Sequence, residues 1–503
     1  LNTRMKKILT IAACLALGAG HVMAQETFPR NGVYDERSGL VALTNATIHT
    51  DYKTTINNAT LLIRNGKVEA VGTGVKVPAG AVTIDTKGKH IYPGLVDMFT
   101  SYGMPEVKSE RGGWGAPPQM DTKKQGAYSW NQAVRPETNA VELFKIDKKQ
   151  AEEMRKLGFG TVLAVHRDGI ARGTATLVTL ADNKRENEVV LLDKAAGALS
   201  FDKGSSTQDY PNSLMGSIAL LRQTYLDAQW NAQNPSKEQN ISLSAFTAAN
   251  KYPQIFEANS KLDVLRADKV GDEFGKQYII KGSGDEYQMI KEIKATNAPI
   301  ILSLNFPDAY SVEDPFDARR VPLEAMKHWE MAPANAALLN KAGVTIAFTA
   351  ADLKDKKDFL PNLRKAIQYG LSEEEALRAL TATPAKLLNA DSKVGSLNKG
   401  MLANFIVTSG NLFASDNIIL ENWVQGSQYK ISDVPADFRG VYTLKMDQQP
   451  ERKLMISGTA EKPELKVIAK DTVSGKVTFN GNLVTLSFAK DKKSKESIRL
   501  SGW

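Results

Sequence analysis

The chain has 503 residues, of which 42% are hydrophobic and 24% charged, a composition typical of a folded protein with more than one domain that excludes wholesale disorder. The formal net charge of +8 is scattered among acidic residues, and the basic run KDKKSKES near the C-terminal end is interpreted as a solvated hairpin turn, so a nucleic-acid partner is not expected. Because Cys14 is the only cysteine, an intrachain disulfide is excluded.

The first 24 residues have the pattern of a secretory signal peptide. A basic start at Lys6 precedes an apolar stretch over 8–17, and the motif VMA ends at Ala24. We therefore predict cleavage after Ala24 and an exported protein, periplasmic or extracellular. The apolar stretch is too short to span a bilayer, so stable membrane insertion is not expected. A lipoprotein attached through Cys14 is disfavoured, because its apolar segment would be very short. Residues 1–4 precede the first methionine and are interpreted as a gene-calling artefact.

The remaining chain divides into four regions by pattern. Residues 25–90 contain short β-branched runs separated by turn residues, with a strong hairpin signal at Asn65-Gly66. Over 91–388 strands alternate with helices, which predicts a parallel sheet covered by helices. The β pattern returns over 389–437, and 438–503 form a further β-rich extension or linker. We predict an α/β fold in which a (β/α)8 TIM-type barrel is inserted in a composite β-sandwich built from both ends of the chain.

Four stretches carry a family resemblance: LLIRNGKVEAVGTG, IDTKGKHIYPGLVD, YGLSEEEALRALTATPAKLL and VGSLNKGMLANFIV. Together they resemble the amidohydrolase superfamily over roughly residues 40–412. The resemblance implies a metal-dependent hydrolase barrel that cleaves carbon–nitrogen bonds in amides or cyclic amides. It also implies one or two divalent ions, usually zinc, bound by histidines on the first, fifth and sixth barrel strands, a lysine or glutamate on the fourth and an aspartate on the eighth.

Most of these implied ligand positions hold other residues in this chain. The positions expected to carry histidines hold Phe99, Ser101, Lys281, Leu304 and Asn305. On the last strand the expected aspartate position holds alanine, and Asp352 is displaced by one or two residues, which in a strand turns a side chain to the other face. We therefore predict no intact metal site and no intact cofactor.

Five residues near predicted strand ends are the candidate site. His166 ends the predicted strand in GTVLAVHRDG, on the rim where such barrels keep their active sites. His166 and Asp352 are the candidate catalytic residues, and Arg167, Arg172 and Lys281 are candidates for substrate binding. Arg172 lies in GIARGTATLV, a loop with two glycines that could wrap an anionic group; the alternative, which we favour, is a tight turn with a solvated arginine. The other histidines of the mature chain are expected to have structural or solvent-facing roles: His49, His90 and His328.

The sequence leaves three alternative functions open. The first is a hydrolase of carbon–nitrogen bonds acting on a small-molecule substrate. The second is a catalytically inactive domain, a pseudoenzyme that serves as scaffold for a tandem amidohydrolase half, which is expected to follow the abrupt end at Trp503. The third is an exported ligand-binding protein that uses Trp114, Trp130 and Trp230.

Overall fold

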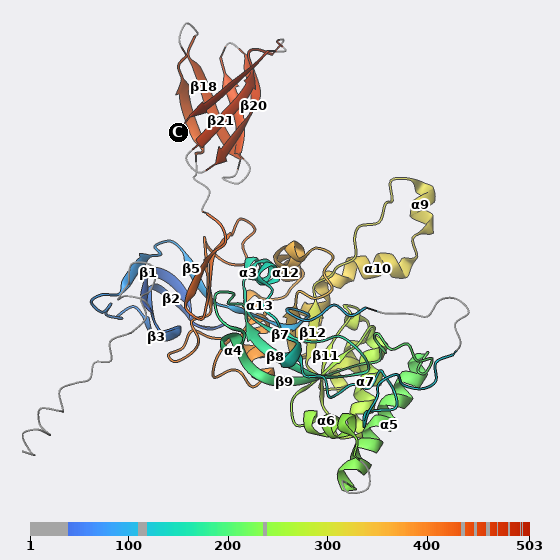
Figure 1. The fold of residues 1–503 in the computed structure, drawn as a ribbon. Helices are drawn as coiled ribbons and strands as arrows, with labels where there is room; N and C mark the ends of the chain where they lie inside the picture. Colours follow the sequence, from blue (N-terminus) through green and yellow to red (C-terminus); the bar gives the residue numbers. More distant parts are fainter. Residues whose placement is uncertain are drawn as a thin grey trace, which may run out of the picture.

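The computed structural model describes residues 39–108, 118–234, 239–433, 438–446, 450–458, 463–469, 471–480, 483–492, 494 and 496–502 (Figure 1). The predicted signal peptide, Trp114 and Trp503 lie outside the described residues. Within the described part, a search for helices with the length and apolarity of a membrane span finds no candidate.

The first sheet combines strands from both ends of the chain. Its order is β16-β15-β14-β5-β1-β2-β3, with β4 also paired to β1. The strands are β1 (Leu40–His49), β2 (Thr55–Arg64), β3 (Lys67–Gly72), β4 (Val82–Asp85), β5 (His90–Pro93), β14 (Phe405–Thr408), β15 (Ile419–Val424) and β16 (Ser427–Lys430). The β2–β3 hairpin turns at Asn65 (φ 49°) and Gly66 (φ 76°), because a two-residue turn of this hand needs positive φ at both positions.

The second sheet is mixed. Its order is β13-β12-β11-β10-β9-β8-β7-β6. The strands are β6 (Leu95–Thr100), β7 (Phe159–Ala164), β8 (Ala171–Thr179), β9 (Val190–Ser200), β10 (Gln254–Glu257), β11 (Tyr278–Lys281), β12 (Ile300–Ser303) and β13 (Ile346–Thr349). All neighbours pair in parallel except β8, which is antiparallel to both β7 and β9. The predicted alternation of strands and helices therefore holds from β9 to β13 and fails between β7 and β9.

The helices of this region follow the strands that they cover. They are α2 (Ala140–Leu143), α3 (Lys148–Lys156), α4 (Glu186–Val189), α5 (Leu214–Gln233), α6 (Ile241–Ala249), α7 (Lys261–Glu273), α8 (Ile290–Ala295), α9 (Pro315–Arg320), α10 (Leu323–Met331), α11 (Asn335–Lys341), α12 (Phe359–Gln368), α13 (Glu373–Leu380) and α14 (Ala382–Leu387), with short 3-10 turns at η1 (Glu286–Met289), η2 (Ala332–Ala334) and η3 (Lys356–Asp358). Several begin at a capping side chain: the Ser372 hydroxyl accepts a hydrogen bond from the Glu375 amide at the start of α13.

The C-terminal region forms a third sheet. Strands β17 (Gly440–Leu444), β18 (Arg452–Gly458), β19 (Pro463–Ile468), β20 (Thr472–Asn480), β21 (Leu483–Ala489) and β22 (Ser497–Gly502) pair in chain order as an antiparallel meander. Their inward side chains form a separate hydrophobic cluster. Figure 1 shows this sheet standing apart from the other two. The run KDKKSKES joins β21 to β22, the hairpin position predicted for it.

Candidate functional site

The carboxyl ends of several parallel strands place charged side chains on one rim of the second sheet. Arg167 follows β7, Glu257 ends β10, Lys281 ends β11 and Asp352 lies shortly after β13. Arg172 joins them from β8. Parallel strands end at the same edge of a sheet, so residues far apart in the chain meet here. The structure thus brings together four of the five predicted site residues and adds Glu257.

These five side chains form a continuous chain of ion pairs, here called the rim network: Arg172–Glu257–Arg167–Asp352–Lys281. Arg172 and Arg167 each donate to one carboxylate oxygen of Glu257. A second nitrogen of Arg167 donates to Asp352 Oδ1 at 2.9 Å, and Lys281 Nζ donates to Asp352 Oδ2. Each carboxylate is therefore held by two cations.

Electrostatics in the rim network favour the ionised forms. Burial alone would raise the pKa of Glu257, but the two neighbouring guanidinium groups outweigh it and hold that pKa below its ordinary value. Burial would also raise the pKa of Asp352, and Lys281 and Arg167 likewise hold it below its ordinary value. Both carboxylates are thus kept ionised at neutral pH, and three basic side chains face them.

Arg172 corrects the sequence interpretation of its segment. The stretch read as a glycine-containing loop is strand β8, and Arg172 is only 4% exposed rather than solvated. Its Nε donates to the carbonyl oxygen of Gly169 at 2.9 Å, while its other end meets Glu257. The loop interpretation failed because the β-branched residues that follow Gly173 extend a hairpin with β7.

Phe99 supports the central arginine of the rim network. Its side chain is buried, and the Arg167 guanidinium lies 5.3 Å from its ring centroid, within cation–π range. The aromatic face thereby supports the central arginine of the rim network at a position where the resemblance implies a metal-binding histidine.

Asp97 links the first and last strands of the second sheet. Its two carboxylate oxygens accept hydrogen bonds from the amides of Phe99 and Ala350, each at 2.9 Å. Thr349 Oγ1 also donates to the carbonyl oxygen of Phe99 at 2.7 Å. Asp97 is fully buried, and burial raises its pKa to about 6. We assign it a structural role.

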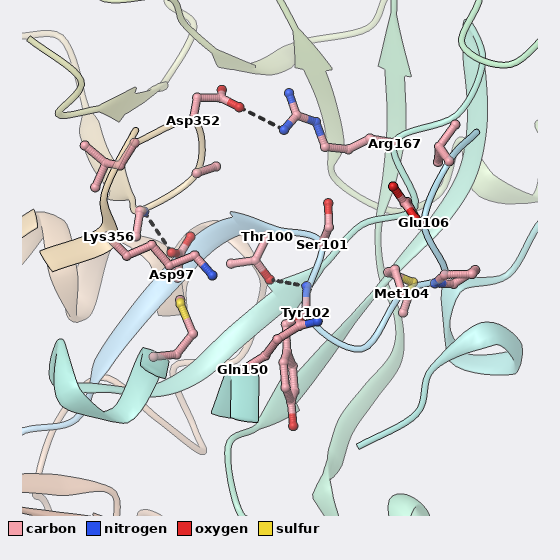
Figure 2. A pocket seen from close by; sticks show the side chains of 16 residues that line it. Asp97, Thr100, Ser101, Tyr102, Met104, Glu106, Gln150, Arg167, Asp352 and Lys356 are labelled. Carbon is pink, nitrogen blue, oxygen red and sulfur yellow. Dashed lines mark hydrogen bonds and ion pairs between the residues drawn. The ribbon is translucent and has the colours of Figure 1, made fainter. Parts of the chain in front are cut away.

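A cavity of about 620 Å³ opens between the ends of β6 and β13. Figure 2 shows Arg167 and Asp352 bonded to each other at this cavity, whose lining also includes Asp97, Lys356 and Ser101. Its volume lies in the range of small-molecule sites. Trp130 stacks instead on Tyr210, and neither Trp130 nor Trp230 is among the lining residues.

His166 lies outside the rim network. Burial lowers its pKa, and no hydrogen-bond partner of its Nδ1 is found among the described residues. The adjacent Asp168 is engaged elsewhere, by Arg135 and by the amide and hydroxyl of Ser205 at 2.7 and 2.8 Å. The geometry therefore pairs Asp352 with Lys281 and Arg167 rather than with His166.

The three other histidines take up contacts away from the rim. His49 Nε2 and His90 Nδ1 lie 3.2 Å apart in the first sheet, and His49 stacks on Tyr92. His328, on α10, has its Nδ1 3.1 Å from the hydroxyl of Tyr287.

The rim network does not suit a divalent ion. Among the described residues, no three histidine, cysteine or acidic side chains converge in a way that could hold a metal. The two carboxylates present are already neutralised by Arg167, Arg172 and Lys281, whose nitrogens are donors without a lone pair to offer. A dication would have to displace these cations and would gain no imidazole ligand.

Sequence reasoning missed Glu257. The resemblance implies a lysine or glutamate on the fourth barrel strand, and Glu257 ends β10, the fourth parallel strand when the antiparallel β8 is set aside. The sequence signal that could have indicated Glu257 was its place directly after the apolar residues Ile255 and Phe256. Without the strand count, that residue could not be assigned to the rim.

Comparisons with known proteins find similar sequences and structures. The model of the amidohydrolase family matches residues 271–482. Imidazolonepropionase of Klebsiella pneumoniae (strain 342) is 20% identical over 377 residues, covering 72% of this chain and 89% of the relative. Dihydroorotase of Geobacter metallireducens is 50% identical over a short stretch of 38 residues, 8% of this chain and 9% of the relative. An amidohydrolase structure from Thermotoga maritima MSB8 superposes with a TM-score of 0.62 at 22% identity, covering 78% of this chain and 100% of that chain, and so supports the fold.

Proposed function

Since this chain is a member of the amidohydrolase superfamily, we propose that it is a pseudoenzyme of that superfamily, in which internal cations stand where divalent ions are expected. The single observation that carries this proposal is the rim network. It keeps carboxylates at the fourth and last parallel strands and neutralises them with Arg167, Arg172 and Lys281. A guanidinium or ammonium group can balance charge, but it cannot act as the Lewis acid that lowers the pKa of bound water.

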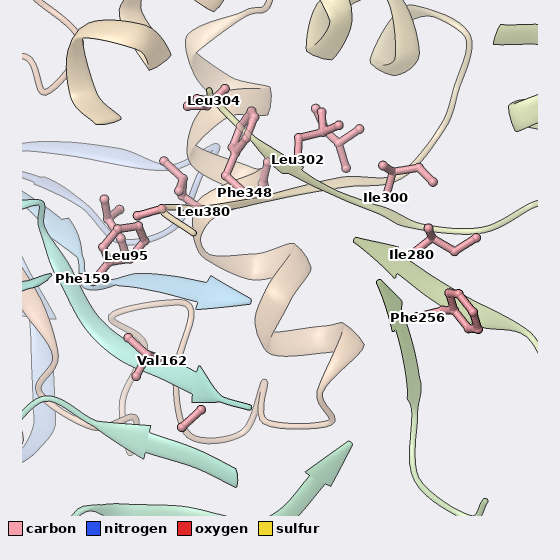
Figure 3. Packing of buried hydrophobic residues seen from close by; sticks show 14 of the residues in the cluster. Leu95, Phe159, Val162, Phe256, Ile280, Ile300, Leu302, Leu304, Phe348 and Leu380 are labelled. Carbon is pink, nitrogen blue, oxygen red and sulfur yellow. The ribbon is translucent and has the colours of Figure 1, made fainter. Parts of the chain in front are cut away.

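We propose further that the second sheet is a closed barrel, built from seven parallel strands and the antiparallel β8. Successive side chains of a strand point to opposite faces, so a barrel should divide its residues between an interior and an exterior cluster. One buried cluster receives a residue from every strand: Val96, Leu163, Ala175, Ala196, Ile255, Ile279, Ile301 and Ala347. Their sequence neighbours, among them Phe256, Ile280 and Phe348, belong to another cluster that includes Leu380 of α13 (Figure 3).

Metal binding and hydrolysis together test the pseudoenzyme proposal. The purified chain should retain only substoichiometric zinc or manganese after dialysis, show no binding heat with either ion, and leave dipeptides and cyclic amides intact while a metal-dependent amidohydrolase cleaves them in parallel. The double substitution Arg167→Ala with Lys281→Ala removes cations from both carboxylates and should increase zinc affinity. Tight zinc binding by the unmodified chain, coupled to hydrolysis, would refute the proposal.

The proposed partner is a second, catalytic amidohydrolase unit for which this barrel is the scaffold, and the proposed location is outside the cytoplasm after cleavage behind Ala24. The β-rich region from 438 onward supports the first idea as a connecting segment. The coding sequence downstream of residue 503 tests it, and N-terminal sequencing of the secreted protein tests the second.

A second candidate function is small-molecule binding, favoured by the cavity of about 620 Å³ beside Arg167. The excess cation of the rim network favours a ligand with a carboxylate. Small carboxylic acids and amino acids should then raise the melting temperature, and Ser101→Trp, which fills an exposed wall of the cavity, should abolish that rise without changing the melting temperature of the free protein.

A further inference from the structure

Residues 438–503 hold most of the excess positive charge, which corrects the expectation that this charge is scattered along the chain. Residues 438–503 contain thirteen lysines and arginines but only seven acidic residues, whereas residues 25–437 contain 48 basic and 49 acidic residues. The body of the protein is therefore nearly neutral, and the C-terminal unit carries a formal charge of +6. Such segregation indicates a binding surface for an anionic partner rather than a general adjustment of solubility.

Strand register places four of the basic side chains of this sheet on one face. Successive residues of a strand alternate between faces, and the inward set is the hydrophobic cluster that includes Leu454, Val467 and Phe488. Lys466 pairs with Ser474 of β20 and Ser487 pairs with both Lys476 and Arg499, so all of these side chains share the outward face. Lys453, Lys466, Lys476 and Arg499 are exposed, and within the described residues no carboxylate forms an ion pair with them.

The same face carries exposed apolar side chains. Val441 and Met455 are direct cross-strand partners, 62% and 37% exposed, and Met455 pairs in turn with Lys466. Most other outward positions hold serine or threonine, and Glu464, which pairs with Ser457, places one exposed carboxylate on this face. Large apolar side chains flanked by lysines are typical of surfaces that lie in the headgroup region of a bilayer, where the cations meet phosphates and the apolar groups enter the acyl boundary.

We propose that the outward face of the third sheet binds the surface of a membrane that contains anionic lipids. Polysaccharides and nucleic acids would use the cations but gain nothing from Val441 and Met455, which is why a lipid surface is the favoured partner. The binding is peripheral, and it requires no membrane-spanning helix. It is independent of any activity at the rim network.

Co-sedimentation of the full chain with vesicles tests the proposal. Vesicles of phosphatidylcholine containing phosphatidylglycerol should bind the protein, and vesicles of phosphatidylcholine alone should not. A basic residue near an anionic bilayer contributes roughly a fivefold gain in affinity, so replacing Lys466, Lys476 and Arg499 by glutamine should weaken binding about a hundredfold. The matched control replaces three exposed lysines of the body, Lys76, Lys341 and Lys399, which lowers the net charge equally.

The outcomes separate the alternatives. Loss of binding in the first variant and retention in the control support the proposal, as does release of the unmodified chain by salt, a readout that does not depend on folding of a variant. Substituting Met455 by serine should also weaken vesicle binding while leaving binding to heparin unchanged. Equal loss in both triple variants, equal binding to neutral vesicles, or binding to heparin or DNA without binding to anionic vesicles would overturn it.

Discussion

Replacing Glu257 by glutamine tests whether the rim network stabilises the strand ends. Glu257 is 5% exposed, and its two oxygens are divided between Arg167 and Arg172. Glutamine keeps the shape of the side chain but removes its charge and turns one acceptor into an N–H group that faces a guanidinium. Arg172, 4% exposed, then loses its carboxylate partner and has only neutral oxygens as acceptors, the carbonyl of Gly169 and the single amide oxygen that glutamine keeps.

The expected cost follows from the unequal burial of the two arginines. Removing one partner of a buried ion pair leaves an uncompensated charge and costs about 3–5 kcal/mol, and Arg172 meets that condition. The Arg167 side chain is 31% exposed and still pairs with Asp352, so it adds little to the loss. We expect the free energy of unfolding to fall by about 3–5 kcal/mol for Glu257→Gln.

Urea unfolding followed by tryptophan fluorescence measures this change, because five of the six tryptophans lie between residues 114 and 423. The matched control is Glu273→Gln, which breaks an exposed pair with Arg222 whose side chains are 39% and 37% exposed. The control should cost less than about 1 kcal/mol. If Glu257→Gln costs no more than the control, Arg172 is hydrated and the reasoning fails. The double substitution Arg172→Met with Glu257→Leu should recover much of the loss.

Three further changes have defined outcomes. Burial raises the pKa of Asp97 from 3.8 to about 6, so its contribution to stability is present below pH 3.8 and is lost as the pH rises through 6. Urea titrations at several pH values should show the free energy of unfolding falling by about 3 kcal/mol over this range, and Asp97→Asn should not show this fall. Burial and the neighbouring His90 lower the pKa of His49 from 6.5 to about 4, so its contribution to stability is present above pH 6.5 and is lost as the pH falls through 4. The melting temperature of His49→Gln should therefore fall less between pH 6.5 and 4 than that of the unmodified chain. Gly173→Ala sets a Cβ 1.8 Å from the carbonyl oxygen of Thr138 at φ +84° and should cost more than about 3 kcal/mol by calorimetry, whereas Gly275→Ala, with open space at φ +64°, should cost only about 1 kcal/mol.

Local patterns were sufficient to predict much of the fold. The runs that became β7, β11 and β13 are mainly apolar because strands covered on both faces bury every side chain, and all three are buried along their length. Asn65-Gly66 predicted the β2–β3 hairpin because few other dipeptides tolerate positive φ at both positions.

Strand direction and charge pairing could not be predicted in the same way. An apolar or β-branched run reads the same in either direction, so β8 gave no sign that it returns antiparallel to β7. The partners of Glu257 lie 85 and 90 residues away in the sequence, and only the sheet order brings them to the same rim. The sequence predicted Arg167, Arg172, Lys281 and Asp352 as rim residues, but it could not reveal that they bind one another.

The rim network also supplies positive charge to the two carboxylates at the ends of β10 and β13. Two carboxylates on a buried rim are unstable unless positive charge accompanies them, because desolvating an unpaired charge costs several kcal/mol. A metal-dependent relative meets that need with a dication, which must be acquired after synthesis. Here Arg167, Arg172 and Lys281 supply three positive charges from the chain itself, two of them on side chains that are nearly fully buried. The charge balance of these two carboxylates is therefore met by side chains of the chain itself.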